Sequence, residues 1–263
     1  MSNHINIRRA RLRTVGVLAG ALALYVSAAL AATLLSGSAV VGALVSNAAA
    51  FAAGLFWLRT QPRREGSEGP VSNRGVLGQG RGFWALTAAS LALCWIVGQA
   101  ASVWLYSLVG SAEFDQHAAA KSSAPIPLTL LLVLILAPMG EEMLMRGVAY
   151  TRLRRHLPPL AAAVVTAAVF SLLHLNLVQI VATLPLGLLL AAVYEQTGRL
   201  APVIGLHAVF NLLSVIVPVA LVSSLSSLTF VLLGGSGLAL LLVQLYKPLS
   251  AVSREREVAG SHA

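Results

Sequence analysis

The stretch PLTLLLVLILAPMGEEMLMRGVAY, residues 127–150, decides the fold. A helix needs roughly 20 apolar residues, each rising about 1.5 Å, to cross the hydrocarbon core of a bilayer. This stretch is long enough, and no charged residue interrupts it before Glu141. Glu141, Glu142 and Arg146 then fall inside the same apolar run. The stretch therefore predicts a membrane-spanning helix that carries charged side chains into the bilayer.

Similar apolar runs lie on both sides of this stretch. Of the 263 residues in the chain, 57% are hydrophobic and 10% are charged, whereas a soluble domain carries about 25% charged residues. A chain this apolar cannot cover itself with polar surface, so the lipid bilayer must be its solvent. We expect an all-α polytopic transmembrane helical bundle of about eight spans, at residues 14–36, 39–58, 83–109, 127–150, 159–177, 178–195, 200–222 and 225–246.

Basic residues mark the ends of these spans. The net charge of +9 could suggest a nucleic-acid partner, but the basic residues separate apolar runs, so we expect no nucleic acid. Threading eight spans places nearly all of them on one side: Arg8, Arg9, Arg11, Arg13, Arg59, Arg63, Arg64, Arg74, Arg81, Arg152, Arg154, Arg155, Arg199, Lys247, Arg254 and Arg256. The other side receives only Lys121, near Glu113 and Asp115. The positive-inside rule then puts both termini in the cytoplasm.

The first span has a second interpretation. The basic stretch Arg8–Arg13, the apolar run after it and the Ala-x-Ala pattern at Ala29–Ala31 resemble a secretory signal peptide. The apolar run is longer than the usual core of a signal peptide, which has about 7–15 residues. We therefore favour an uncleaved first span, and cleavage stays open. Residues 60–82, rich in Gly, Ser, Pro and Arg, predict a flexible cytoplasmic loop.

Ionisable residues inside the spans are the candidate functional residues. Each costs roughly 3 kcal/mol to place at the centre of a membrane helix, so such residues are usually functional. Glu142 and Arg146 are four apart in the fourth span, so they share a helix face and can form an ion pair. Glu141 lies about 100° around the helix from Glu142, so it can point at a cavity instead.

Two histidines complete the set of intramembrane ionisable residues. His174 in the fifth span follows Phe170 by four residues, and His207 in the seventh span precedes Asn211 by four residues. A carboxylate and a histidine can hold and deprotonate a water molecule, while a second histidine and an amide can stabilise an oxyanion. The same Glu and His residues could instead bind Zn²⁺, with water as the fourth ligand. The sequence contains neither His-Glu-x-x-His nor Gly-x-Ser-x-Gly.

Three short motifs resemble those of the CAAX-protease and bacteriocin-processing family of intramembrane proteases, also called Abi. They are EEMLMRG at 141–147, FSLLH at 170–174 and HAVFN at 207–211. The resemblance covers roughly residues 126–215. It implies that this region is the catalytic core, that residues 1–125 are N-terminal accessory transmembrane helices with a cytoplasmic loop, and that residues 216–263 are a last transmembrane helix and a cytoplasmic tail.

The resemblance also implies a role for each site residue. Glu141 would activate the water with His174, while His207 and Asn211 would form the oxyanion site. Glu142 and Arg146 would support the site, and Phe170 would pack beside it. Both a metal-dependent and a metal-independent glutamate mechanism are argued for the family. We favour the metal-independent one, and a Zn²⁺ site formed by Glu141, His174 and His207 stays open.

The implied partner is a membrane-associated peptide or protein substrate, cleaved at a peptide bond. Nothing in the sequence indicates a eukaryotic host, so we expect a bacterial plasma membrane, and a role for prenylation does not follow. Two other functions remain possible. One is a non-enzymatic scaffold or bacteriocin-immunity protein of the same fold. The other is a small ion or proton transporter that uses Glu141 and the histidines as a relay, although transporters often show repeat symmetry, and we find no internal repeat.

Overall fold

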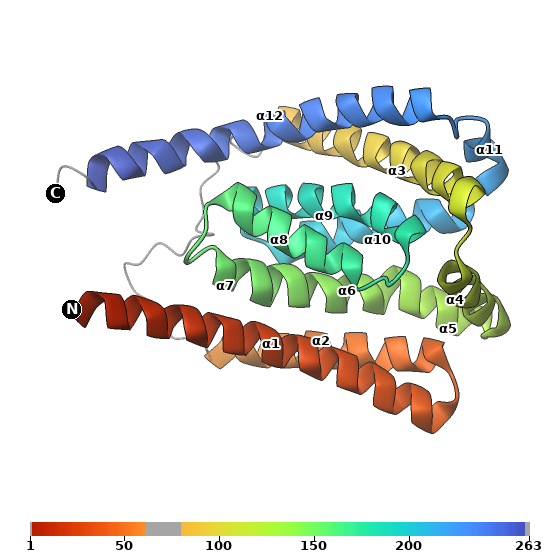
Figure 1. The fold of residues 1–263 in the computed structure, drawn as a ribbon, viewed down its shortest axis with the longest axis horizontal. Coiled ribbons are helices and arrows are strands. Elements are labelled where there is room, and N and C mark those ends of the chain that lie inside the picture. The colour runs from red at the N-terminus through yellow and green to blue at the C-terminus, as the bar shows by residue number, and fades with distance from the viewer. Residues whose placement is uncertain (1, 61–79, 261–263) are drawn as a thin grey trace. The chain divides into compact units, whose positions relative to one another are not determined.

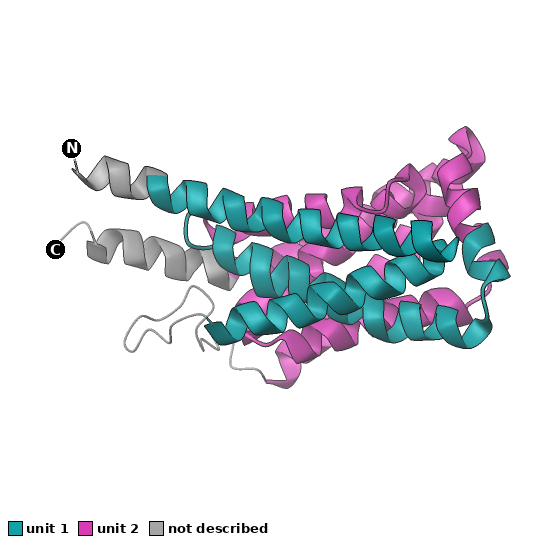
Figure 2. Cartoon of the chain, turned by 90° about the horizontal axis from the view of Figure 1, so that it is seen from below, with its two compact units in different colours: residues 1–70, 119–157 teal, residues 71–118, 158–263 magenta. Residues whose placement is uncertain are grey.

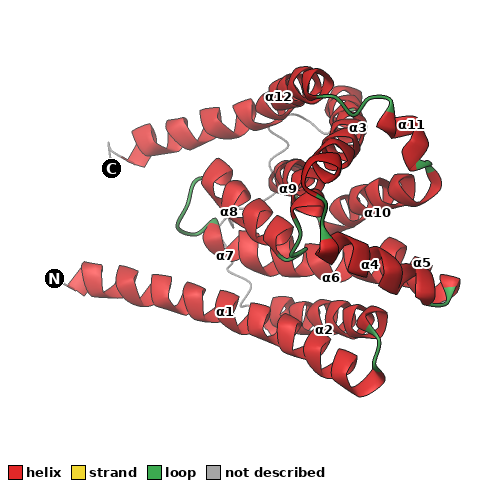
Figure 3. Ribbon diagram, turned by 45° about the vertical axis from the view of Figure 1, so that its right-hand side comes forward, coloured by secondary structure: helices red, strands yellow, loops and turns green. Residues whose placement is uncertain are grey.

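The computed structural model describes residues 2–60 and 80–260. These residues form helices and short turns, with no strand among them (Figure 3). Six helices of this described part are long and apolar enough to cross a membrane: Arg9–Ser36, Ala39–Thr60, Arg81–Val109, Ile126–Leu153, Leu177–Thr197 and Leu228–Lys247. Two shorter apolar helices are Pro159–Leu172 and Leu200–Ile216. The all-helical membrane architecture predicted from the sequence is therefore confirmed, with six helices of spanning length where eight were expected.

The helices fall into two compact units, coloured separately in Figure 2. Unit 1 comprises residues 1–70 and 119–157, and unit 2 comprises residues 71–118 and 158–263. The elements are α1 (Ser2–Ser36), α2 (Ala39–Thr60), α3 (Arg81–Val109), α4 (Ala112–Ser123), α5 (Ile126–Leu131), η1 (Leu132–Leu136), α6 (Ala137–Glu142), η2 (Met143–Tyr150), α7 (Thr151–Leu153), α8 (Pro159–Leu172), α9 (Leu177–Thr197), α10 (Leu200–Ile216), α11 (Val219–Ser223) and α12 (Leu228–Gly260).

In unit 1, α1 and α2 form a tight antiparallel hairpin, with the two helices side by side in Figure 1. Gly42 of α2 packs directly on Thr33 and on the carbonyl oxygen of Ala29, both in α1. Farther along α2, Gly54 packs on Met143 of η2. Small residues at such contacts let helix backbones approach closely, which is how helices pack without a hydrophobic driving force in lipid.

The fourth predicted span is one continuous helical stretch with two wide turns. η1 and η2 are π-helical segments, whose backbone hydrogen bonds run from residue i to i+5, and α6 lies between them. Pro138, near the start of α6, offers the physical reason for η1. A proline ring lacks an N–H and clashes with the carbonyl one turn earlier, so the helix around it must widen or kink. Such π segments often occur at functional sites.

In unit 2, α9 packs against both α8 and α3. A Cβ atom at Gly187 of α9 would lie 2.9 Å from the Cβ of Ala167 in α8. A Cβ atom at Gly98 of α3 would lie 3.2 Å from the Cα of Ala182 in α9. These glycines therefore fix a close approach of the three helices, and α12 covers α3 and α9.

The structure differs from the sequence-based prediction at the ends of the two shorter helices. The fifth span, expected to run to residue 177, ends at Leu172. The seventh, expected to run to residue 222, ends at Ile216, because Val217 is extended before Pro218, as residues that precede proline prefer. A separate helix, α11, then follows. In the predicted cytoplasmic loop at 60–82, residues 61–79 lie outside the described residues.

Candidate active site

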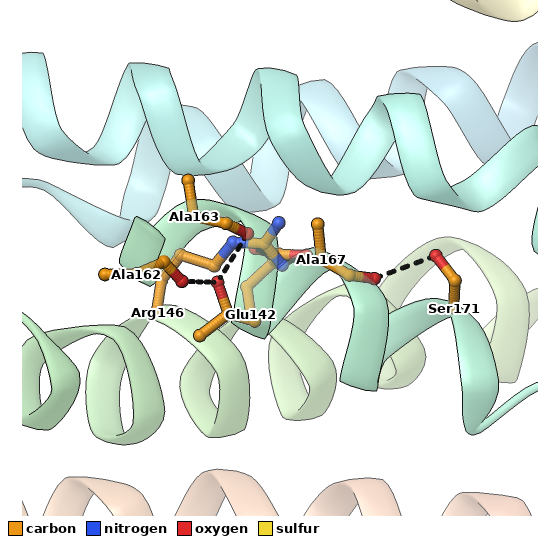
Figure 4. A network of polar contacts seen from close by, with 7 residues as sticks. Glu142, Arg146, Ala162, Ala163, Ala167 and Ser171 are labelled. Carbon is orange, nitrogen blue, oxygen red and sulfur yellow. Dashed lines mark hydrogen bonds and ion pairs between the residues drawn. The ribbon is translucent and has the colours of Figure 1, made fainter. Parts of the chain in front are cut away.

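Glu142 and Arg146 form an ion pair inside unit 1. The Arg146 Nη1 atom lies 2.9 Å from Glu142 Oε2 and donates a hydrogen bond of 3.1 Å to Glu142 Oε1 (Figure 4). Both side chains are completely buried. The spacing of four residues predicted this pair, and the structure confirms it. Because a buried charge without a partner is very costly, each member of the pair offsets the cost of burying the other.

Glu141 differs from its neighbour in exposure. It is half-buried, whereas Glu142 is fully buried. The rotation of about 100° per residue explains the difference, since adjacent residues of a helix point to different faces. The two carboxylates are therefore in different environments, as their sequence pattern predicted.

In unit 2, Phe170 lies against both histidines of the predicted set. The centroid of its ring lies 5.3 Å from the ring centroid of His174 and 5.6 Å from that of His207. The angles between the ring planes are 83° and 87°. Both arrangements are the edge-to-face geometry that aromatic rings favour. Phe170 and His207 are buried, while His174 is half-buried. Two histidines that are 33 positions apart in the chain (174 and 207) are thus gathered around one aromatic ring.

His174 lies in the turn after α8, not inside a helix as predicted. Its Nδ1 atom is 3.0 Å from the carbonyl oxygen of Phe170. A carbonyl oxygen only accepts hydrogen bonds, so Nδ1 carries the proton in this geometry, and Nε2 is the basic nitrogen of the neutral ring. The next residue, Leu175, has a φ of 57°, a left-handed conformation that is rare for residues other than glycine and often marks functional sites.

Asn176, at the start of α9, also holds this turn in place. Its Oδ1 atom accepts a 2.9 Å hydrogen bond from the backbone N–H of Gln179 and so caps the start of α9. Its Nδ2 atom donates a 2.8 Å hydrogen bond to the carbonyl oxygen of His174. Asn176 is buried, so this side chain ties the backbone of His174 to a helix end. Sequence reasoning overlooked Asn176, although asparagine before an apolar helical run is a recognised capping signal.

α10 carries His207 and Asn211 one turn apart. Its orientation is held by Ser214, whose hydroxyl accepts a 3.0 Å hydrogen bond from the indole N–H of Trp95 and one of 3.1 Å from Gln99 Nε2, both in α3. The same hydroxyl donates to the carbonyl oxygen of Phe210 at 3.0 Å. These contacts anchor the helix that carries the proposed oxyanion residues. Such anchoring matters, because a catalytic side chain needs a fixed backbone.

A basic cluster marks one end of unit 1. The guanidinium of Arg152 lies 4.9 Å above the ring of Trp57, a cation–π contact. His156 Nε2 is 3.0 Å from the Thr14 hydroxyl. Burial, followed by the positive charges of Arg11, Arg155 and Arg152, lowers the pKa of His156 below its ordinary value, so this ring is neutral at pH 7. An Arg and a Trp at a span end are typical of a membrane interface.

Asn47, an amide inside the predicted second span, is a further buried polar residue that the sequence analysis does not single out. Asn47 of α2 is 2% exposed, and its Nδ2 atom donates a 2.9 Å hydrogen bond to the carbonyl oxygen of Ala43. The signal was present in the sequence, since an amide in an apolar run is costly unless it is hydrogen-bonded. It was passed over because Asn47 carries no charge.

The predicted site residues are thus described in two groups. Glu141, Glu142 and Arg146 belong to unit 1, and Phe170, His174, His207 and Asn211 belong to unit 2. Among the described residues there is no group of three or more His, Cys, Asp or Glu side chains placed to hold a metal ion.

Comparison with known proteins identifies the region that contains these motifs. Residues 123–213 match the Rce1-like family, described as type II CAAX prenyl endopeptidase Rce1-like. The match confirms the resemblance expected from the three motifs at 141–147, 170–174 and 207–211, and its bounds nearly coincide with the expected 126–215. No curated protein and no solved structure matches the chain.

Proposed function

Because residues 123–213 belong to the Rce1-like family of type II CAAX prenyl endopeptidases, which implies an intramembrane protease, we propose that this chain hydrolyses a peptide bond of a membrane-associated protein or peptide. One observation carries the proposal beyond the family match. His174 and His207 flank the buried ring of Phe170. Ionisable side chains in the apolar part of a membrane protein cost free energy and are usually functional.

The proposed reaction uses four side chains. The Glu141 carboxylate takes a proton from a water molecule that the basic Nε2 of His174 also holds, and the water oxygen bonds to the carbonyl carbon of the substrate. His207 and Asn211 donate hydrogen bonds to the oxyanion that forms on the carbonyl oxygen. The C–N bond then breaks, and the proton on Glu141 passes to the leaving amine. One water is consumed, and a carboxylic acid and an amine are released; the acid then gives its proton to the amine or to water.

The supporting roles follow from the contacts within each unit. Arg146 forms an ion pair with Glu142, so Glu142 has a supporting role in this proposal and the half-buried Glu141 is the base. Phe170 sets the edge-to-face packing of both histidine rings. Asn176 and the hydrogen bond to the Phe170 carbonyl fix the tautomer and position of His174. A general base or oxyanion donor contributes only when it is held in position, so these contacts belong to the proposed mechanism.

The proposed mechanism does not require a metal ion. We therefore expect purified protein treated with 1,10-phenanthroline, and then dialysed, to cleave a membrane-anchored peptide at a rate within about twofold of untreated protein. The reason is that the water is activated by Glu141 and His174 alone. The check is an initial-rate assay together with metal analysis of the same sample. Loss of activity that returns with one equivalent of Zn²⁺ would instead support the Zn²⁺ site of Glu141, His174 and His207.

For the membrane topology we propose eight crossings with both termini in the cytoplasm. The support is the basic cluster at the end of unit 1 and the position of Arg199 directly before α10. At 1.5 Å per residue, the 14 residues of α8 and the 17 of α10 give lengths of about 21 and 26 Å. These are about 9 and 4 Å less than the hydrocarbon thickness of about 30 Å. Local thinning of the bilayer can accommodate that difference at modest cost.

The topology is tested by reporter fusions. A fusion after residue 118, in α4, should report the outer side, and a fusion at the C-terminus should report the cytoplasm. In an eight-span model every Arg or Lys outside the spans except Lys121 lies on the cytoplasmic side. Paired alkaline phosphatase and fluorescent-protein fusions give opposite signals on the two sides. The same side for both positions would contradict the eight-crossing topology.

A further inference from the structure

Three segments of unit 1 meet at its basic end. The hydroxyl of Thr14, near the start of α1, lies 3.0 Å from His156 Nε2 in the turn after α7. The guanidinium of Arg152 in α7 lies 4.9 Å from the centre of the Trp57 ring, near the end of α2. Thr14 is buried, and Trp57 and His156 are half-buried. The start of α1, the end of α2 and the turn after α7 are therefore held together at one place (Figure 1).

The arginines of this end have no carboxylate in the same segments to balance them. Residues 1–60 and 143–157 contain neither Asp nor Glu. Arg11 precedes Thr14 by three residues, so it lies on the same face of α1, one turn nearer the N-terminus. Burial is the leading cause that lowers the pKa of His156, followed by the positive charge of Arg11, and the charge of Arg152 adds to both. Arg11 and Arg152 therefore create a positive potential beside the same imidazole ring.

The side chain of Arg152 has a donor that the described protein does not use. The Nε atom of Arg152 is buried, and it has no hydrogen-bond acceptor within the described residues. A buried donor of this kind calls for an explanation, and an ordered water or an ion is a common one. A guanidinium offers five N–H donors and no acceptor. Because Arg11 adds a second positive charge nearby, an anion suits this place better than a water molecule does.

The surroundings favour the phosphate of a lipid over a free phosphate ion. Arg and Trp at the end of a span are typical of the membrane interface, where the lipid headgroups lie. The same two helix ends expose large apolar side chains: Leu12 is 61% exposed, Val15 62% and Phe56 70%. The acyl chains of a lipid would cover these side chains, whereas a phosphate ion would leave them exposed. Basic pockets between transmembrane helices bind anionic headgroups in this way.

We propose that the basic end of unit 1 binds an anionic phospholipid, with the phosphate between Arg11 and Arg152 and beside His156. A guanidinium donates two parallel hydrogen bonds to a phosphate group. The Trp57 ring under Arg152 restricts this side chain in advance, so less conformational freedom is lost on binding. The lipid holds α1, α2 and α7 together. This site is defined by lipid binding alone and does not depend on the proposed peptidase function.

The test measures lipid binding to the full-length protein, purified in a neutral detergent and freed of bound lipid. Phosphatidylglycerol and phosphatidylcholine with the same acyl chains are added separately, and binding is followed by native mass spectrometry and by the midpoint of thermal unfolding. We expect saturating phosphatidylglycerol to raise the midpoint by about 5 °C, because a ligand that binds only the folded protein stabilises it. Phosphatidylcholine should have little effect, since its headgroup carries no net charge. Equal effects of the two lipids would overturn the proposal.

Two variants test the residues that hold the phosphate. Arg11→Gln and Arg152→Gln each remove one charge and keep a polar side chain. Each should weaken phosphatidylglycerol binding about tenfold, as for loss of one hydrogen bond between charged groups. Arg152→Lys keeps the charge but lacks the planar fork, so its loss should be smaller than that of Arg152→Gln. Arg11 is exposed, so Arg11→Gln still tests the site if Arg152→Gln fails to fold. Wild-type affinity in Arg11→Gln would overturn the proposal.

Arg199→Gln is the matched control. It removes the same charge from an exposed residue that lies directly before α10, in unit 2. We expect its affinity for phosphatidylglycerol to stay within about twofold of wild type, since an exposed charge outside the site acts only through screened attraction. Equal losses in Arg199→Gln and Arg11→Gln would show that net charge alone attracts the lipid, and would overturn the proposed site.

Inorganic phosphate separates a lipid site from a site for the free ion. Added at the same concentration as the lipid, it should neither raise the midpoint of unfolding nor displace phosphatidylglycerol, because it cannot cover the apolar side chains at these helix ends. If inorganic phosphate raises the midpoint as much as phosphatidylglycerol does, the ligand is the free ion and the lipid assignment is wrong.

Discussion

Glu141→Gln should lower the rate of peptide cleavage by a factor on the order of 10²–10⁴, as for loss of a positioned general base. Glutamine keeps the size and polarity of the side chain but cannot take a proton from water. The folded protein should survive, because Glu141 is half-buried and the buried ion pair involves its neighbour Glu142. The measurement is the single-turnover rate on a membrane-anchored reporter peptide, with thermal unfolding in detergent measured on the same preparation.

His174→Ala and the double variant test the same expectation. His174→Ala should be as slow as Glu141→Gln, and the double variant should be little slower than either single one, since residues that act as a unit are not additive. Glu142→Gln is the matched control for the neighbouring carboxylate, and its main loss should be in stability. A Glu141→Gln protein that cleaves at nearly the wild-type rate would remove Glu141 from the mechanism. The scaffold and transporter hypotheses would then gain support.

Arg146→Ala should destabilise the protein by about 3–5 kcal/mol, the usual cost of leaving one member of a buried ion pair without its partner. The pair is completely buried, with Arg146 Nη1 2.9 Å from Glu142 Oε2. We expect a lower yield of folded protein in detergent and a lower midpoint of thermal unfolding, with activity falling in proportion. Measuring activity per folded molecule separates the two effects.

Arg155→Ala is the control for this prediction, because Arg155 is exposed and removal of an exposed charge usually changes stability by less than about 0.5 kcal/mol. Replacing both members of the pair, as Glu142→Leu with Arg146→Met, should recover part of the lost stability, since no buried charge remains. If the Arg146→Ala protein is as stable as wild type but inactive, Arg146 contacts the substrate and the structural interpretation is wrong.

The sequence predicted the helical class and the buried ion pair because both follow from local rules. Apolar runs of span length identify the helices, and a spacing of four residues places Glu142 and Arg146 on one face. The contrast between half-buried Glu141 and buried Glu142 also follows from helix rotation alone. These features need no knowledge of which helices touch.

Helix ends and irregular turns could not be predicted in the same way. Leucine residues continue past Leu172, so hydropathy gives no signal that α8 stops before His174. The turn there depends on the Asn176 side chain and on the left-handed backbone at Leu175, and Leu175 itself gives no indication of that conformation. The wide turns η1 and η2 were likewise not anticipated, although Pro138 indicates some local disruption.

Contacts between helices were the least predictable part of the candidate site. The edge-to-face packing of Phe170 on His207 joins α8 to α10, and no spacing rule relates residues on different helices. The same holds for Asn47 on Gly140, where the close approach depends on a glycine that was not singled out. A neutral polar residue in an apolar helix, such as Asn47, does carry a signal in the sequence, because a buried amide must be hydrogen-bonded.

The central claim is that this protein cleaves peptide bonds of membrane-associated proteins with Glu141 as the base. The most direct measurement compares the protein termini present in membranes from cells that express wild type and from cells that express Glu141→Gln at equal levels, by mass spectrometry. We expect new termini that occur with wild type and are absent with Glu141→Gln. Identical sets of termini in the two membranes would contradict it.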